Sequence, residues 1–134
     1  VRFDGTTNEQ LLKLPKNDIL IELEQWVEDS PYKDRAKLIR SFSHSCLDDF
    51  EDGSLDFVFI DASHQYEDVR RDTVLWSKKV KPRGIVSGHD RNIEGVARFL
   101  HEVSTSFVLQ AEIGCIGETI HGEPDHVWWY QKYG

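Results

Sequence analysis

The sequence predicts an α/β domain with a doubly wound, mostly parallel sheet. Two continuous apolar runs, Leu55 to Asp61 and Gly84 to Gly88, suit strands that are buried on both faces. A helical pattern separates them, and a strand, helix, strand order implies a right-handed crossover between parallel strands. Two further apolar runs near the C-terminus have no helical pattern between them. They are therefore expected to pair antiparallel at one edge of the sheet.

The first half of the chain is predicted to hold one clear helix between two short strands. Val1 to Asp4 has the composition of a strand end. Apolar residues recur at helical spacing from Ile19 to Val27, and this helix should end before Pro31. Ala36 to Phe42 is predicted to be a strand, and Cys46 to Phe50 a short helix.

The second half of the chain alternates strands with amphipathic helices. Apolar residues three or four positions apart predict a helix from Tyr66 to Val80, and Pro82 prevents its continuation. The same spacing predicts a helix from about Ile93 to Val103, with Val96, Phe99, Leu100 and Val103 facing inward. The predicted edge strands are Phe107 to Ile113 and His126 to Gln131.

Length and composition indicate a single domain of 134 residues with a formal net charge of −8. This charge argues against a nucleic-acid-binding face, which usually carries a basic stripe. No apolar run approaches the roughly 18 residues that a membrane span needs. Two cysteines without metal-ligand spacing fit a reducing compartment, so we expect a cytoplasmic protein that binds neither nucleic acid nor membrane. The absence of methionine leads us to expect a piece of a longer reading frame.

Polar side chains follow the two central strands where each strand ends. Asp61 ends the first strand, with His64 three residues later, and His89 and Asp90 end the second. Ligands of open α/β sheets bind beyond the carboxyl ends of the strands. Two neighbouring carboxylates suit Mg²⁺, with His89 as a further ligand, and a histidine near them can accept a proton. The alternative is that these are ordinary exposed strand-end residues.

One segment resembles a known protein family. Asp-Gly-Ser-Leu-Asp-Phe-Val-Phe-Ile-Asp-Ala-Ser-His-Gln-Tyr-Glu-Asp-Val at 52–69, followed by Gly88-His89-Asp90, is similar to the class I S-adenosylmethionine-dependent methyltransferases. The nearest group is the small-molecule O-methyltransferase-like branch, in which one strand ends Asp-x-x-His and the next ends Gly-His-Asp. The resemblance implies a Rossmann-like methyltransferase sheet with an antiparallel C-terminal edge pair.

The resemblance also implies roles for individual residues. Asp61 and Asp90 match the metal-binding acids of cation-dependent members, and His64 matches the position of the general base. Asp4 matches the acid that holds the cofactor ribose, and such strand-end acids bind ribose in other nucleotide-binding folds. The implied cofactor site comprises Asp4, Ser43, His44 and Asp61. The implied cofactors are S-adenosylmethionine and Mg²⁺.

The chain departs from the family pattern at its N-terminus. It has no Gly-x-Gly, and Val1 to Asp4 aligns best with the second strand of the family, so the glycine-rich first strand and first helix are expected upstream. Without that strand the sheet is N-terminally incomplete beside Leu55 to Asp61, and the exposed edge would need a partner. A second copy of the chain is one such partner. We therefore expect a single, partial methyltransferase-like domain at 1–134 that forms a homo-oligomer.

Three functions follow from this reading. The first is methyl transfer from S-adenosylmethionine to a hydroxyl of a small-molecule acceptor, assisted by a divalent cation. The second is a non-catalytic remnant of the fold that has lost cofactor binding and serves in assembly. The third is another Mg²⁺-using enzyme, such as one that handles phosphate. The absence of Gly-x-x-x-x-Gly-Lys argues against its commonest form.

Overall fold

The computed structural model describes residues 5–105, 114–115 and 126–132. The chain divides into two compact units. The N-terminal unit spans Phe3–Cys46 and the C-terminal unit includes Leu47–Gly134. The strand expected at Val1 to Asp4 and the strand expected at Phe107 to Ile113 lie outside the described residues.

The N-terminal unit contains two capped α-helices. Helix α1 (Asn8–Lys13) begins at a capping box, in which the side chain of Thr7 accepts from the backbone N–H of Gln10 at 3.1 Å. Helix α2 (Asp18–Asp29) starts at Asn17, whose side chain accepts a backbone hydrogen bond in the first turn. The predicted helix is confirmed, and it ends two residues before Pro31.

The strand predicted at Ala36 to Phe42 is wrong, because these residues form no regular secondary structure. A strand needs a neighbouring strand for its backbone groups, and within the described part of the N-terminal unit none is present. The backbone finds a side chain instead: the N–H of Phe42 donates to Oδ1 of Asn8 at 3.0 Å. The short helix predicted at Cys46 to Phe50 is a 3-10 helix at Ser43–Asp49, and a second 3-10 helix occupies Lys33–Arg35.

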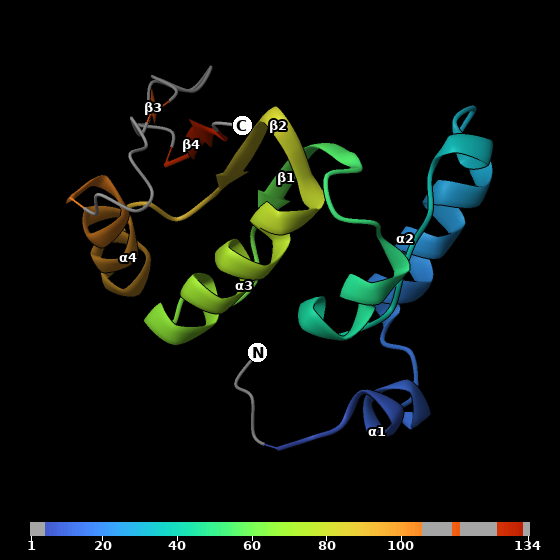
Figure 1. Cartoon of the computed structure of the whole chain (residues 1–134). Coiled ribbons are helices and arrows are strands. Elements are labelled where there is room, and N and C mark those ends of the chain that lie inside the picture. The colour runs from blue at the N-terminus through green and yellow to red at the C-terminus, as the bar shows by residue number, and fades with distance from the viewer. Residues whose placement is uncertain (1–4, 106–113, 116–125, 133–134) are drawn as a thin grey trace. The chain divides into compact units, whose positions relative to one another are not determined.

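The C-terminal unit is built on a small mixed sheet (Figure 1). Its strands are β1 (Leu55–Ile60), β2 (Val80–Gly88), the two-residue β3 (Gly114–Cys115) and β4 (Trp128–Gln131). Their order across the sheet is β1, β2, β4, β3. The first two strands are parallel and the two later pairs are antiparallel. The predicted parallel pair is therefore confirmed, with β2 beginning four residues earlier than predicted. The last strand is antiparallel as predicted, but its described partners are β2 and β3, so the described sheet is mixed and not mostly parallel.

Two helices bury one face of this sheet. Helix α3 (Tyr66–Lys79) carries basic residues in its last turn, which favour the negative end of the helix dipole. Helix α4 (Glu94–Thr105) buries the four inward residues predicted from the sequence. Both helices contribute to one apolar core with β1, β2 and β4, and Figure 1 shows α3 lying along β1 and β2. The core residues are Ile60, Val69, Val80, Val86, Val96, Phe99, Leu100, Val103, Trp128 and Tyr130.

On the opposite face of the sheet, β1 carries exposed aromatic side chains. The rings of Phe57 and Phe59 on β1 stack on each other and are 54% and 45% exposed. Strand β1 is also the edge strand, paired only with β2 where the structure is described. The helices on both faces that a doubly wound sheet requires are thus seen on one face of this unit.

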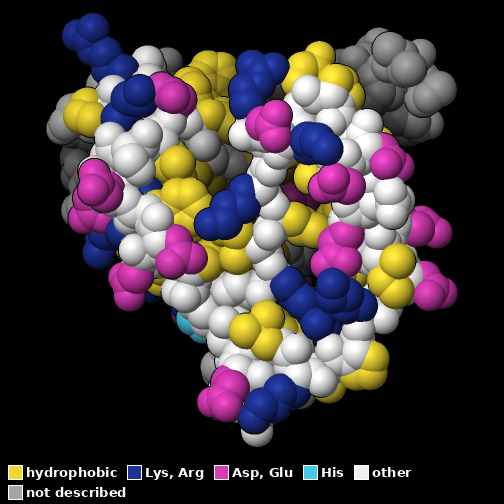
Figure 2. Space-filling view, turned by 90° about the vertical axis from the view of Figure 1, so that its right-hand side faces the viewer, with side chains coloured by type: hydrophobic (Ala, Val, Ile, Leu, Met, Phe, Trp, Pro, Cys, Tyr) yellow, Lys and Arg dark blue, Asp and Glu magenta, His cyan; other side chains and the backbone are white. Residues whose placement is uncertain are grey.

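Charged side chains of both signs are mixed on the face shown in Figure 2. Some form local pairs, such as Lys79 with Asp52 at 2.7 Å. This pair lowers the pKa of the Asp52 carboxyl, mainly through the hydrogen bond from Lys79. Among the described helices, none has the length and apolar character needed to span a membrane.

Candidate functional site

The parallel pairing of β1 and β2 places their carboxyl ends side by side. Ile60 is in register with Gly88, so Asp61 leaves one strand where His89 leaves the other. The backbone N–H of His89 donates to the Ile60 carbonyl at 3.1 Å, which continues the ladder by one more bond. Backbone hydrogen bonds thereby hold together the two chain segments from which the clustered side chains project.

Gly88 allows a third strand to approach this point closely. A Cβ atom at position 88 would lie 2.5 Å from the Ile60 carbonyl oxygen and 2.5 Å from the ring of Trp128. Trp128 is fully buried, and its indole N–H donates to the carbonyl of His89 at 3.1 Å. The segment after β2 is therefore fixed by β1 on one side and by β4 on the other.

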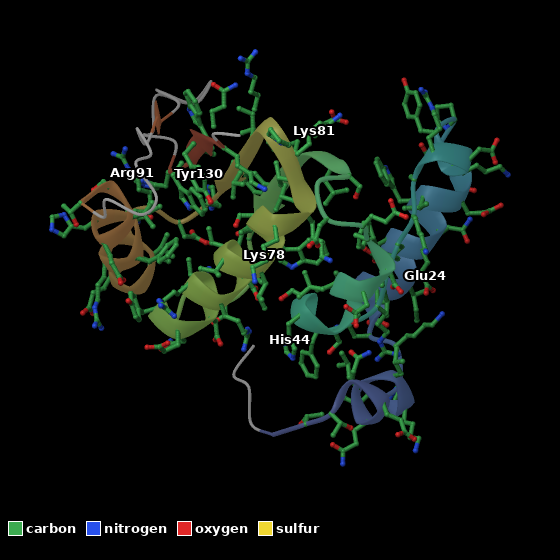
Figure 3. The ribbon with its side chains drawn as sticks, viewed as in Figure 1. Glu24, His44, Lys78, Lys81, Arg91 and Tyr130 are labelled. Atoms are coloured by element: carbon green, nitrogen blue, oxygen red, sulfur yellow. The ribbon has the colours of Figure 1, made fainter. Side chains whose placement is uncertain are left out.

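Asp90 adopts a left-handed backbone conformation with φ 60°. Aspartate tolerates this region better than most residues, at a cost of about 1 kcal/mol. Two hydrogen bonds hold the turn: the N–H of Ile93 donates to the Asp90 carbonyl at 2.9 Å, and the N–H of Arg91 donates to the His126 carbonyl at 3.0 Å. Arg91 itself is exposed and is labelled in Figure 3.

Three side chains converge at the ends of the two strands. One ligand atom each from Asp61, His64 and Asp90 lies within 4.8 Å of the other two. His64 Nε2 is 2.6 Å from Asp90 Oδ2, and His89 Nδ1 is 3.1 Å from the other carboxylate oxygen, Oδ1. The side chain of Asp90 is 20% exposed and that of His64 is 45% exposed. The group is therefore accessible to solvent, with Asp90 as its more buried member.

These side chains line a small open pocket. Its polar wall comprises Asp61, Ser63, His64, His89 and Asp90. Its apolar wall comprises Ile60, Val69, Val96 and Trp128, all of which belong to the core. The site therefore rests directly on the best-packed part of the unit.

The group can serve two kinds of chemistry. Two carboxylates and an imidazole form a donor set for a divalent cation, with the imidazole favouring Mn²⁺ or Zn²⁺ more than an all-oxygen site would. In the absence of a cation, the close contact between His64 and Asp90 is a base and carboxylate pair, in which the carboxylate orients the imidazole and stabilises its charged form.

The remaining predicted site residues lie elsewhere. Asp4 is outside the described residues. Ser43 and His44 begin the 3-10 helix at Ser43–Asp49 and belong to the N-terminal unit, where the His44 ring stacks on Phe42 with centroids 5.9 Å apart. Their proposed contact with a cofactor stays a prediction. His89 binds Asp90 from the far side and is not one of the three clustered residues.

The sequence pattern singles out neither Trp128 nor Gly95 as a site residue, yet Trp128 lines the pocket and Gly95 lies against the His64 backbone. From the sequence, Trp128 is predicted to be a core residue of an edge strand. Its indole contact with His89 joins residues that are distant in sequence, so no local pattern predicts it. Gly95 offers a local signal, because glycine inside an amphipathic helix pattern usually has a packing reason. A Cβ atom there would overlap with the His64 carbonyl oxygen.

The fold is similar to that of two solved structures. A protein from Corynebacterium glutamicum aligns with a TM-score of 0.59 at 12% identity, over 86% of this chain and 55% of that one. A possible exported protein from Bordetella parapertussis aligns with a TM-score of 0.53 at 9% identity, over 88% of this chain and 51% of that one. These identities establish a shared fold only. The chain spans about half the length of either structure.

Sequence comparison connects the chain to a family. An uncharacterized protein of Sinorhizobium fredii, y4gI, is 38% identical over 58 residues, which are 43% of this chain and 6% of that protein. The sequence profile of a family described as methyltransferase domain matches residues 7–91, which cover both clustered aspartates and His64. Since this match spans more than half of the 134 residues, the chain belongs to the methyltransferase-domain family, whose cofactor is S-adenosylmethionine.

Proposed function

We propose that the protein transfers a methyl group from S-adenosylmethionine to a hydroxyl oxygen of a small molecule, with the help of a divalent cation. The observation that carries this proposal is the convergence of Asp61, His64 and Asp90 at the carboxyl ends of two adjacent parallel strands. Open α/β sheets bind their ligands at this edge. A methyltransferase-domain chain thus has an acid, base and cation-ligand set where its substrates should meet.

The proposed step needs alignment and the removal of one proton. The hydroxyl oxygen attacks the methyl carbon, a C–O bond forms, and the C–S bond breaks with its electron pair going to sulfur. The sulfonium becomes a neutral thioether, and the hydroxyl proton passes to a base. Because the displacement is direct, the protein contributes mainly by holding oxygen and methyl in line and by accepting the proton.

His64 is the proposed base. Its Nε2 contacts Asp90 Oδ2, so the neutral tautomer that donates this hydrogen bond carries its lone pair on Nδ1. In our proposal Nδ1 takes the substrate proton. Asp90 then stabilises the imidazolium, and His89 on the second oxygen keeps the carboxylate in place.

The two carboxylates of this group fit a divalent cation. Asp61 and Asp90 would supply oxygen ligands, His64 would keep its lone pair for the substrate proton, and the remaining positions would be open to solvent or substrate. A bound cation supplies Lewis acidity, which lowers the pKa of a coordinated hydroxyl. Asp61 is exposed at the rim of the pocket, so its carboxylate can reach a ligand without displacing core side chains.

Cofactor binding is tested by calorimetric titration of S-adenosylhomocysteine into the 134-residue chain. Saturable heat at micromolar to millimolar ligand supports the proposal. An absence of heat at millimolar ligand supports the alternative, a non-catalytic remnant of the fold that acts in assembly.

The cation site is tested with one variant and a matched control. Asp61→Asn should weaken Mn²⁺ affinity about 10-fold or more and remove the Mn²⁺-dependent rise in Tm, because it deletes a charged ligand. Asp56→Asn makes the same change in charge on β1, the strand that Asp61 follows, at an exposed residue paired with Lys81. It should keep the full rise. A full Mn²⁺-dependent rise in Asp61→Asn would place the cation elsewhere.

A further inference from the structure

We propose that helix α4 is the positioning element for His64. In this inference Gly95 allows the first turn of the helix to meet the backbone after β1, and Glu102 and Arg98 clamp Tyr66 at the end of the same segment. The inference rests on the proposed function and deepens it, since the side chain that α4 positions is the proposed base.

Gly95 in the first turn of α4 lies directly against the backbone of the His64 segment. A Cβ atom at position 95 would lie 2.8 Å from the backbone nitrogen of Tyr66 and would overlap with the carbonyl oxygen of His64. Both are backbone atoms, which cannot turn aside as the tip of a flexible side chain can. Any larger residue would therefore have to move the His64 backbone away from α4, or α4 away from His64.

The segment that carries Asp90 is continuous with this first turn. The Asp90 carbonyl accepts from the N–H of Ile93 at 2.9 Å, and the Ile93 carbonyl accepts from the N–H of Ala97 at 2.8 Å. Asp90 and Gly95 consequently belong to one hydrogen-bonded turn and helix. His64 touches this assembly twice, through its ring at Asp90 Oδ2 and through its carbonyl at Gly95. The approach of α4 thus sets the distance between the imidazole and the carboxylate.

A second pair of contacts holds the far end of the His64 segment. The hydroxyl of Tyr66 donates to the carboxylate of Glu102, which lies two turns after Gly95 on the same face of α4. The guanidinium of Arg98 lies over the Tyr66 ring, 4.1 Å from its centroid. Glu102 and Arg98 both lie on α4, so this helix contacts Tyr66 at its hydroxyl and at its ring face.

The start of the segment is held independently by α3. The hydroxyl of Ser63 donates to Asp68 Oδ2 at 2.6 Å and accepts from the backbone N–H of Gln65 at 3.2 Å. Because Ser63 is hydrogen-bonded to α3, a larger residue at position 95 would mainly displace His64. This is why we expect the effect of a substitution to appear at the imidazole.

The test follows the His64 ring directly in the metal-free protein. Imidazole nitrogen signals are recorded by long-range ¹H–¹⁵N correlation at one fixed pH, and the His64 signals are identified by their loss in His64→Gln. In Gly95→Ala we expect the Nε2 signal to move toward that of a solvent-exposed imidazole and Mn²⁺ affinity to fall about 10-fold, as for other changes behind a metal ligand.

The matched control separates the steric effect of a side chain at position 95 from a change in the stability of α4. Ala97→Gly lowers helix propensity at an exposed position of the same helix, whereas Gly95→Ala raises it. The control should keep the wild-type His64 signal and Mn²⁺ affinity. The inference is overturned if folded Gly95→Ala keeps both, or if Ala97→Gly changes both to the same extent.

A gentler variant tests the second contact and covers the case in which Gly95→Ala does not fold. Tyr66→Phe removes the hydroxyl and keeps the ring under Arg98. We expect a shift of the His64 signal in the same direction, with Glu102→Gln giving a similar shift and the double variant adding little, since the two residues act as one pair. An unchanged His64 signal in Tyr66→Phe would overturn the proposed contribution of the contact between Tyr66 and Glu102.

The two proposals fail in different ways. If the wild-type chain binds no Mn²⁺, the cation part of the proposed function is lost. The positioning inference is still decided by the His64 ring signal, which is read without any metal or cofactor.

Discussion

Asp90 connects both histidines of the site. Its backbone takes up a left-handed turn, and its two carboxylate oxygens contact two different histidines. A residue in this conformation persists only where its neighbours hold it, and hydrogen bonds within the turn and to His126 do so here. The geometry at Asp90 is therefore a product of tertiary contacts, although the residue itself was predictable from its place at a strand end.

Tyr130 offers a prediction about stability at alkaline pH. Its ring is 5% exposed, lies on β4 and is labelled in Figure 3. Burial raises the pKa of Tyr130 from 10.0 to about 12, partly offset by a hydrogen bond with Ser77. Since the folded-state pKa lies above the unfolded value, the stabilisation is fully present below pH 10 and is lost as the pH rises toward 12.

The measurement is urea unfolding at pH 9 and pH 11. The wild type should lose about 1 kcal/mol more stability over this range than Tyr130→Phe, which has no hydroxyl to ionise. Tyr32→Phe is the control, because Tyr32 is 60% exposed, and it should behave as the wild type. Equal losses in the wild type and Tyr130→Phe would contradict the prediction.

At the scale of helices and strands, the sequence predicts best where a segment carries its own signals. Helices α3 and α4 both have an amphipathic pattern, and the four inward residues predicted for α4 are buried as expected. The segment from Ala36 to Phe42 has strand-like residues but no partner strand among the described residues of its unit, so its composition was misleading. Which strand pairs with which is decided by contacts that are distant in sequence, and local patterns carry little of that information.

Gly88→Ala tests the crossing of three strands at the site. The added methyl group would meet the Ile60 carbonyl and the Trp128 ring at 2.5 Å, and neither can move without disturbing the core. We expect a loss of about 1–3 kcal/mol in the free energy of unfolding, which is typical of overpacking, measured by urea denaturation.

The control for this variant is Gly53→Asn. Gly53 has φ 67°, which asparagine tolerates, and the nearest atom to an added Cβ is 4.0 Å away. This variant should stay within about 0.5 kcal/mol of the wild type, as surface substitutions usually do. A Gly88→Ala variant as stable as Gly53→Asn would show that the crossing can relax.

For the whole molecule, the buried residues are unevenly distributed. Every described residue classed as buried lies at Ile60 or later, within the C-terminal unit, and the described residues of the N-terminal unit are exposed or half-buried. The net charge of −8 and the length follow directly from the sequence. The difference in burial between the two units does not, because α2 and α4 both have an amphipathic apolar pattern.

Hydrogen exchange should reveal this division. Backbone amides of β2 and α4 lie over the buried core and should exchange slowly, whereas those of α2 should exchange far faster, because regions with few buried contacts open at low free energy. Exchange followed by mass spectrometry of peptides from the two units provides the comparison. Protection of α2 equal to that of α4 would contradict the prediction.

The hydrogen bond from Trp128 to His89 has a practical consequence for anyone who shortens this chain. The region of family similarity stops at residue 91 and retains all three clustered side chains. Truncation there would remove the indole that supports the His89 carbonyl, together with the His126 carbonyl that receives the Arg91 N–H. The boundary of detectable homology is thus a poor cutting point, since the last strand braces the turn from which Asp90 projects.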